Sequence, residues 1–461
     1  MQTSASSMHS YTVGFSLFAS LPSRFRASLV SYARSRAFDI LESGLRKGHL
    51  VVEDDEGKHV FGEPVSSQET VVMTVRNPDV WARLFLSYDI GLGEAYMQGD
   101  YDVSSLKGLF NLWLDNRASL AEFSSTLGTL FAYYSAVAIN CLGRQTLSMS
   151  RLNVEVAYDV SNELYERFLS KEMMYSCAIW GEEENGVRGD LTVGPTPGDL
   201  EAAQLRKIRH ILKKARLRPG DHLLEIGSGW GGMSLEAARM GCTVDTVTLS
   251  SEQKAMTERR AAAEGLSERI RVHLCDYREL PRELAGTCDA LVSCEMIEAV
   301  GPQHYHEYFG AIDWALKKDR AAVVITATAQ PEHRYTDFQP DDFARHYHWP
   351  NTHLPSATSL AVAMQKAVPG KFVLESIEDH GIHYPRTLRE WGRRLENNWK
   401  GELIVHLQEK YPELGKKENL EAFKRKWMYM FAYAEVGYAR AYTSLNCWAW
   451  TRPENVSEIC A

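Results

Sequence analysis

The hydrophobic pattern in the second half of the chain alternates between two periods. Short apolar runs, typical of strands buried on both faces, are followed by segments in which apolar residues recur every three or four positions. This βαβ alternation predicts a doubly wound, mostly parallel α/β sheet that binds ligands at the carboxyl ends of its strands. We expect strands at 222–226, 243–249, 270–275, 290–294 and 321–327, and helices at 252–264, 303–316 and from the first strand to Met240.

The first half of the chain has a different pattern. Residues 47–61 alternate as in a hairpin with a charged turn, and residues 69–75 form a β-branched strand. Helices are predicted at 80–88 and 104–116. Because 461 residues are long for one core, we expect two domains. The predicted parts are a flexible or targeting segment (1–36), a smaller N-terminal α+β domain (37–150), the sheet domain (151–450) and a tail (451–461).

Charge and cysteine content exclude some classes of function. The net charge of -9 argues against a nucleic-acid-binding protein, which would need a basic surface. The eight cysteines show no CxxC pair and no metal-ligand spacing, so no metal site is predicted. Their pattern favours a reducing compartment over a disulfide framework.

The N-terminal segment leaves the location of the protein open. Residues 1–36 contain ten serines, four arginines and no acid, which is typical of an organellar transit peptide and so keeps mitochondrial import open. A disordered tail leading into a basic, membrane-facing helix fits equally well. Residues 123–143 are uncharged, but their serines, threonines, glycines and Asn140 favour a buried or interfacial helix over a membrane span.

One motif points to a nucleoside cofactor. The run LLEIGSGWGG (223–232) is a buried strand that enters a glycine turn, with Glu225 two residues before the first glycine. Glycines let the backbone approach a ligand closely. Because Gly227, Gly229 and Gly232 also match G-x-G-x-x-G, the motif alone fits both NAD and S-adenosylmethionine.

The ends of the next two strands distinguish the two cofactors. An NAD site needs an acid at the end of the second strand to hold the ribose hydroxyls. Here that strand ends in Thr248-Leu249-Ser250, whereas the third strand runs into Asp276-Tyr277. An aspartate there can accept from an adenine amino group, and a tyrosine can cover the adenine face. The sequence therefore favours S-adenosylmethionine.

Further motifs narrow the assignment to one family. They include YDVSNELYERFL (158–169), MMYSCAIW (173–180), EMIEAVG (295–301), HYPRTLREW (383–391) and GLGEAYMQGDYDVSSLKGLF (91–110). Together with the glycine motif they resemble the cyclopropane fatty acid synthase family of methyltransferases over roughly residues 80–450. The resemblance implies a Rossmann-like class I methyltransferase domain with a seven-stranded sheet.

The resemblance also implies the chemistry. Members transfer a methyl group to a cis double bond in a phospholipid acyl chain, and a base then removes a proton from the new methyl so that a cyclopropane ring closes. The family is understood to use bound bicarbonate as this base. By motif, Glu298 would accept a hydrogen bond from bicarbonate, and Tyr384 and Cys177 would position it.

The cofactor-binding residues follow in the same way. Tyr175 and Ser176 match residues that line the methionine end of the cofactor, and Glu225 belongs to the glycine motif. The remaining matches form the turn, the ribose-binding strand end and the adenine site: Gly227, Ser228, Gly229, Trp230, Thr248, Leu249, Gln253, Asp276 and Tyr277.

Three positions depart from the pattern of the family. Many members have histidine or glutamine in the bicarbonate site where this chain has Thr326, which puts ring closure in doubt. Ala299 replaces a histidine that often follows the glutamate. Ala434 replaces a C-terminal cysteine, so a cysteine nucleophile is excluded there.

Two rival functions stay open at this point. A related lipid C-methyltransferase would leave a methyl branch on a fatty acyl chain or sphingoid base. Thr326 favours this alternative, because it puts ring closure in doubt. A degenerate lipid-binding protein is the other. For the leading function we expect a cytoplasmic protein at the membrane surface, commonly a homodimer in the family. Anionic head groups would contact Arg24, Arg26, Arg34, Arg36 and Arg46.

Overall fold

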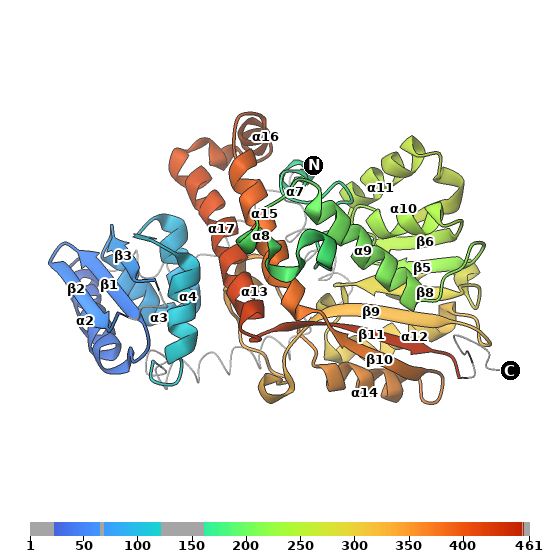
Figure 1. The fold of residues 1–461 in the computed structure, drawn as a ribbon, viewed down its shortest axis with the longest axis horizontal. Coiled ribbons are helices and arrows are strands. Elements are labelled where there is room, and N and C mark those ends of the chain that lie inside the picture. Colours follow the sequence, from blue (N-terminus) through green and yellow to red (C-terminus); the bar gives the residue numbers. More distant parts are fainter. Residues whose placement is uncertain (1–22, 65–68, 121–160, 454, 456–461) are drawn as a thin grey trace. The chain divides into compact units, whose positions relative to one another are not determined.

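The computed structural model describes residues 23–64, 69–120, 161–453 and 455. The chain divides into two compact units (Figure 1). Unit 1 comprises Met1–Leu142, Pro340–His348 and Gln408–Val436. Unit 2 comprises Gly143–Gln339, Trp349–Leu407 and Gly437–Ala461. The predicted boundary lay at residue 150 and kept each domain continuous, so the observed division differs in both respects.

Unit 2 contains a seven-stranded sheet of order β10-β11-β9-β8-β5-β6-β7. All neighbouring pairs are parallel except those of β11, which runs antiparallel to β9 and β10. The predicted mostly parallel, doubly wound sheet is therefore confirmed. Its strands are β5 (His222–Ile226), β6 (Thr243–Thr248), β7 (Ile270–Leu274), β8 (Ala290–Cys294), β9 (Ala322–Ala329), β10 (Val373–Asp379) and β11 (Ser444–Thr451).

Helices cover both faces of this sheet (Figure 1). Adjacent strand residues point to opposite faces, so Leu223 packs into one apolar core and Leu224 into the other. The first core includes residues of α9 and α10, and the second includes residues of α12 and α14. The longer helices of unit 2 are α9 (Asp199–Lys214), α10 (Gly232–Arg239), α11 (Ser251–Ala263), α12 (Tyr305–Ala315), α14 (Ala357–Ala367) and α15 (Tyr384–Asn398); α7 (Asn162–Glu166) and α8 (Gly189–Thr192) are short.

Unit 1 is built on a four-stranded sheet of order β2-β1-β3-β4. The predicted hairpin is confirmed, because β1 and β2 pair antiparallel. Ser105 caps α4 by accepting a hydrogen bond from Gly108 N. The elements are α2 (Ser23–Gly44), β1 (His49–Asp54), β2 (Gly57–Gly62), β3 (Val71–Val75), α3 (Asp79–Gln98), β4 (Tyr101–Val103), α4 (Leu106–Asn116) and α13 (Phe343–Tyr347).

Segments distant in sequence join unit 1 through specific contacts. The ring of Phe343 lies against Gly93, where a Cβ would clash with it. Arg425 donates to Tyr96 O at 2.6 Å and to the Asp102 carboxylate at 3.0 Å. The boundary between the units falls within α16 (Glu402–Lys410) and α17 (Lys417–Ala439). These long-range contacts explain why the predicted continuous domain was incomplete.

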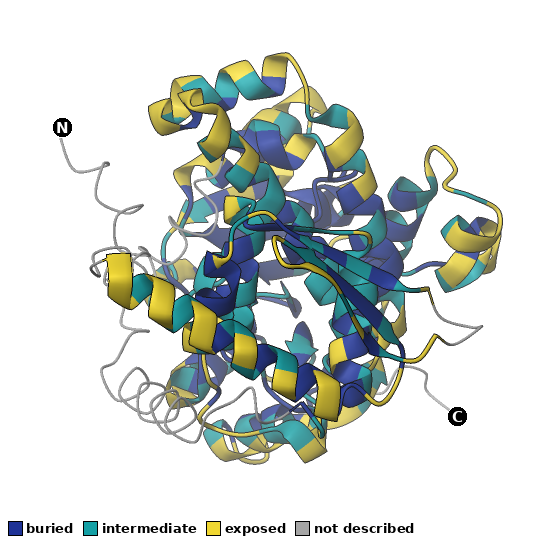
Figure 2. Ribbon diagram, turned by 90° about the vertical axis from the view of Figure 1, so that its left-hand side faces the viewer, coloured by how far each residue is buried: buried dark blue, intermediate teal, exposed yellow. Residues whose placement is uncertain are grey.

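Buried residues concentrate in the strands, and exposed positions lie mainly on helices and loops (Figure 2). Among the described helices, none combines the length and apolarity that a membrane crossing requires. The uncharged stretch at 123–143 and most of the predicted segment 1–36 lie outside the described residues.

Candidate active site

The glycine turn follows β5, where the strand order reverses between β6 and β8. Gly227 and Gly229 have φ values of 94° and 48°, in the left-handed region that favours glycine. The amides of Gly227 and Ser228 both donate to Val247 O, at 3.0 and 3.1 Å. A switch point of this kind, with a backbone turn free of side chains, suits a nucleoside cofactor.

Two side chains of the glycine motif serve the fold itself. Glu225 accepts hydrogen bonds from Ser234 Oγ and, at 2.8 Å, from Thr246 Oγ1, and burial raises the pKa of its carboxyl to about 7. The indole of Trp230 is buried and donates to Asn162 Oδ1 at 2.7 Å. In both cases the side chain holds the turn in place, so a ligand would meet the turn mainly through its backbone.

The ends of β6 and β7 place the predicted ribose and adenine groups. Thr248 Oγ1 donates to Gln253 Oε1 at 2.8 Å, while Leu249, between them in sequence, is half-buried. Asp276 accepts from Arg278 Nε at 2.7 Å and Nη2 at 2.9 Å. Asp276 Oδ1 also accepts from Arg278 N at 3.0 Å, so Oδ2 is the oxygen that keeps a lone pair for an adenine amino group. Tyr277 packs edge-on against Tyr308, and burial raises the pKa of its hydroxyl.

The residues predicted at the methionine end lie in the loop that precedes Cys177. Tyr175 packs against the rings of Tyr165 and Trp391, each with its centroid 5.2 Å away. Ser176 Oγ accepts a hydrogen bond from the buried Lys207 Nζ at 2.6 Å. The loop is thus fixed on both sides, and its Ser176 hydroxyl is already engaged by an ammonium group.

Glu298, Tyr384 and Cys177 were the predicted catalytic residues. In the structure Tyr384 and Cys177 are joined through a residue that was not predicted, Glu295. The Tyr384 hydroxyl donates to Glu295 Oε2 at 2.7 Å, and the Cys177 amide donates to Glu295 Oε1 at 2.8 Å. Glu295 directly follows β8, at the carboxyl edge of the sheet. The Cys177 thiol donates instead to Ala178 O at 3.3 Å, and burial raises its pKa well above the ordinary value.

Glu298 lies in a 3₁₀ turn (Ile297–Ala299) immediately beyond Glu295. Its Oε1 accepts from Thr328 N at 2.6 Å, whereas its buried Oε2 has no partner among the described residues. Burial, reinforced by the negative charge of Glu295, raises the pKa of Glu298 to about 8. The Thr328 hydroxyl is hydrogen-bonded to Tyr438, whose ring stacks on Tyr384 at 4.3 Å.

These contacts test the predicted bicarbonate ion. The two positioning groups, the Tyr384 hydroxyl and the Cys177 amide, both donate to the Glu295 carboxylate. Thr326 Oγ1 donates to Cys294 Sγ at 3.4 Å. A further anion would lie beside two acidic side chains while its donors are engaged. The residues present therefore do not fit a bound bicarbonate.

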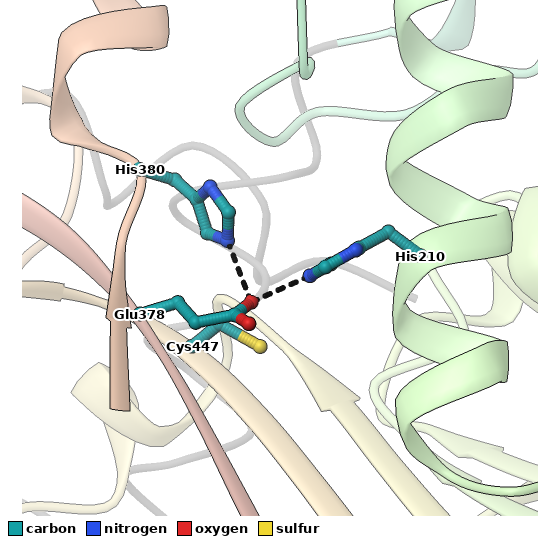
Figure 3. Close-up of side chains that lie close together, drawn as sticks. All are labelled: His210, Glu378, His380 and Cys447. Atoms are coloured by element: carbon teal, nitrogen blue, oxygen red, sulfur yellow. Dashed lines mark hydrogen bonds and ion pairs between the residues drawn. The ribbon is translucent and has the colours of Figure 1, made fainter. Parts of the chain in front are cut away.

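A small pocket beside Glu295 reaches a second polar group. Its lining includes Cys177, Lys207, Thr326, His210, His380 and Cys447. In Figure 3 the two imidazoles point toward the Glu378 carboxylate, and the Cys447 thiol lies beside it. His210 Nε2 is 2.6 Å and His380 Nε2 is 3.3 Å from Glu378 Oε2.

The donor types in this cluster are those of a zinc site, but its geometry is that of hydrogen bonds. Tetrahedral zinc bonds of about 2.0–2.3 Å separate ligand atoms by roughly 3.3–3.8 Å. Here the separations run from 2.6 Å to as much as 4.8 Å, and Lys214 already pairs with Glu378. The cluster therefore joins α9 to strand β10 as an ion-pair and hydrogen-bond network.

Two residues of the site were not predicted from sequence. Glu295 stands three residues before Glu298, and its position at a strand end was the available signal. Lys207 lies on α9, and its burial next to Ser176 depends on tertiary packing. An acid at the end of β8 could have been singled out, whereas the buried lysine could not.

Known proteins resemble this chain along most of its length. The family model described as mycolic acid cyclopropane synthetase matches residues 145–447. Tuberculostearic acid methyltransferase UfaA1 of Mycobacterium tuberculosis is 32% identical over 82% of each chain. Cyclopropane-fatty-acyl-phospholipid synthase of Escherichia coli is 31% identical over 84% of this chain and 89% of its own.

A solved structure supports the same fold. Mycolic acid cyclopropane synthase CmaA1, complexed with SAH and CTAB, superposes with a TM-score of 0.52 at 21% identity. The superposition covers 66% of this chain and 98% of that one. At this identity the likeness concerns the fold, which is that of the Rossmann-like methyltransferases.

Proposed function

The chain belongs to the mycolic acid cyclopropane synthetase family, and from that premise we propose that it forms cyclopropane rings in phospholipid acyl chains. It is an S-adenosylmethionine-dependent methyltransferase of lipids. In the proposed reaction the methyl group joins one carbon of a cis double bond and then bridges to the other. The observation that carries the proposal is the Glu295–Tyr384–Cys177 arrangement beside Glu298 at the end of β8.

The proposed reaction places distinct demands on the residues. S-adenosylmethionine, when bound, supplies an electrophilic methyl group. We assign its binding to the 227–230 backbone, Tyr175, Thr248, Gln253 and Asp276. An alkene is a weak nucleophile, so the protein must hold it in line and exclude water. The buried surroundings of Cys177, Tyr384 and Glu298, each less than a tenth exposed, support a site from which water is excluded.

A methyl branch instead of a ring is the second candidate. Its support is Thr326, whose hydroxyl is directed to Cys294 and offers no donor for a proton-accepting anion. A similar relative is named a tuberculostearic acid methyltransferase, and at 32% identity it is as close as the E. coli synthase. A degenerate binding protein has less support, because two buried carboxyl groups at one strand end are costly to keep without a role.

We also propose peripheral attachment to the membrane that holds the substrate. On α2, Phe25 and Tyr32 are 71% and 59% exposed and lie seven residues apart, on the same face of the helix. Exposed aromatic residues beside Arg24 suit a lipid–water interface. Arg26 and Arg34, predicted to contact head groups, instead pair with Asp79 and Asp54. A homodimer, as is common in the family, belongs to the same proposal.

One incubation tests the proposed function. The purified protein is mixed with vesicles of unsaturated phospholipid and S-adenosylmethionine, and the acyl chains are analysed by mass spectrometry and NMR. The upfield signals of a cyclopropane methylene support the proposal. A methyl branch supports the second candidate, and unchanged lipid with no release of S-adenosylhomocysteine contradicts both.

A further inference from the structure

The Glu295 side chain occupies the hydrogen-bonding position predicted for bicarbonate. A carboxylate and a bicarbonate ion share a planar O–C–O group of the same size. Here one oxygen of that group accepts from Tyr384 at 2.7 Å and the other from the Cys177 amide at 2.8 Å. These are two of the three groups expected to surround the ion. The chain thus carries, as a side chain, an anion of the expected shape.

The backbone at Glu295 also indicates a specific placement. Its φ of 50° lies in the left-handed region, where residues other than glycine are uncommon and concentrate at functional sites. The Glu295 amide donates to Thr326 O at 2.8 Å, which anchors the residue to β9. The fold therefore holds a glutamate in a conformation that glycine would adopt more easily, and the result is a carboxylate aimed at Tyr384.

The groups around the two carboxyls stabilise a negative charge better on Glu295 than on Glu298. Burial raises the pKa of Glu295, but the Tyr384 hydroxyl, the Cys177 amide and the Lys207 ammonium all oppose that shift. Glu298 accepts a hydrogen bond from Thr328 N and lies near the negative charge of Glu295, and burial together with that charge raises its pKa to about 8. With a donor on each oxygen, the Glu295 carboxylate is therefore the better stabilised of the two anions.

We propose that Glu295 is the catalytic base of ring closure, a proposal that rests on the cyclopropane-forming function proposed above. After methyl transfer the lipid carries a cation on the neighbouring carbon. Glu295 removes a proton from the new methyl group, and the electron pair of that C–H bond forms the third C–C bond of the ring. The proton ends on a Glu295 carboxyl oxygen, and the ring product no longer carries a positive charge.

The hydrogen bonds also explain how a carboxylate can face a carbocation without forming an ester. Each Glu295 oxygen already accepts one hydrogen bond, and the residue is fixed at both its amide and its side chain. A held, hydrogen-bonded oxygen can reach a proton on the methyl group without collapsing onto the cationic carbon. Tyr384 and the Cys177 amide are thus positioning groups for Glu295.

Chemical rescue tests this role. Ring formation by the wild-type protein is measured in CO₂-free buffer and with millimolar bicarbonate, and no difference is expected. Glu295→Gly removes the carboxylate, suits the left-handed backbone and leaves space for a small anion. We expect it to lose at least 100-fold in ring formation and to recover at least tenfold with bicarbonate or formate. Glu295→Gln fills that space, so it should stay inactive in either buffer.

The controls separate this inference from the proposed function. Glu268→Gln, on an exposed 3₁₀ turn, should keep wild-type turnover in both buffers. Calorimetric binding of S-adenosylhomocysteine by each variant verifies folding. Wild-type ring formation that collapses without bicarbonate, or near-normal turnover by Glu295→Gln, overturns the role of Glu295 alone. A wild-type protein that makes no ring under any condition overturns the proposed function as well.

Discussion

At the scale of single residues, the site depends on the different surroundings of two acids that lie three positions apart in the chain. Glu295 has a hydroxyl, an amide and a nearby ammonium group to stabilise its charge, whereas Glu298 accepts from Thr328 and is repelled by the charge of Glu295. Sequence motifs pointed to Glu298, because its spacing to Val300-Gly301 matches the family. They could not show which carboxylate Tyr384 contacts, since Tyr384 is 89 positions away in the chain.

Replacing Tyr384 by phenylalanine tests the bond to Glu295. The loss of a hydrogen bond to a charged group costs about 1.5–3 kcal/mol, so kcat should fall roughly 10- to 100-fold with little change in KM. The pKa of Glu295 should rise further, so the ascending limb of the kcat–pH profile should move to higher pH. An unchanged profile, with unchanged kcat, would show that the hydroxyl does not act through Glu295.

The raised pKa of Glu298 should make the free energy of unfolding depend on pH. The pKa of its carboxyl rises from 4.5 unfolded to about 8 folded, so between these values the folded state binds the extra proton. The free energy of unfolding should therefore decrease as pH rises through this window, by up to about 1.4 kcal/mol per pH unit. Glu298→Gln should remove this slope in denaturant titrations, and a slope identical to wild type would contradict the assignment.

At the scale of elements, the sequence of the β5–α10 turn leaves the backbone few other conformations. A buried strand runs into glycines with positive φ, and Gly231 is the N-cap of α10. The strands of the parallel sheet were predictable for the same reason, because doubly buried strands read as continuous apolar runs. Strands β10 and β11 were not among the segments predicted individually. Five of the seven residues of β10 are exposed and the other two are half-buried, so this edge strand has no continuous apolar run, and its pairing with β11 joins positions about 70 apart in the chain.

Two glycines of the turn provide a matched comparison. A Cβ at Gly227 would lie 3.1 Å from Met296 with a φ of 94°, whereas Gly229 has open space and a φ of 48°. Gly227→Ala should therefore weaken S-adenosylmethionine binding at least tenfold, while Gly229→Ala should cost only about 1 kcal/mol of folding stability. Isothermal titration with S-adenosylhomocysteine and thermal unfolding measure both effects. Equal affinities for the two variants would contradict the role given to Gly227.

At the scale of the whole molecule, the two units were predicted in outline but not in membership. Composition and length indicated two domains, and the strands and helices of residues 47–116 were largely placed. That Phe343 and Arg425 belong with the N-terminal unit depends on contacts to Gly93 and Asp102. Such contacts join residues hundreds of positions apart, so no local pattern of the sequence can predict them.

The exposed aromatic residues of α2, Phe25 and Tyr32, are the proposed contact of the protein with lipid. Phe25→Ser with Tyr32→Ser should weaken binding to anionic phospholipid vesicles in co-sedimentation at least tenfold, because each aromatic ring buried at the interface contributes about 1–2 kcal/mol. Turnover on a detergent-dispersed substrate should not change. Vesicle binding equal to that of the wild-type protein would exclude α2 as the contact surface.

The central claim is that the transferred methyl group becomes a ring methylene. The most direct test uses S-adenosylmethionine with a fully deuterated methyl group, unsaturated phospholipid vesicles and the wild-type protein, followed by mass spectrometry and NMR of the acyl chains. Ring closure removes one deuteron, so we expect a cyclopropane carbon that carries two deuterium atoms. A methyl branch that retains three deuterium atoms would contradict it.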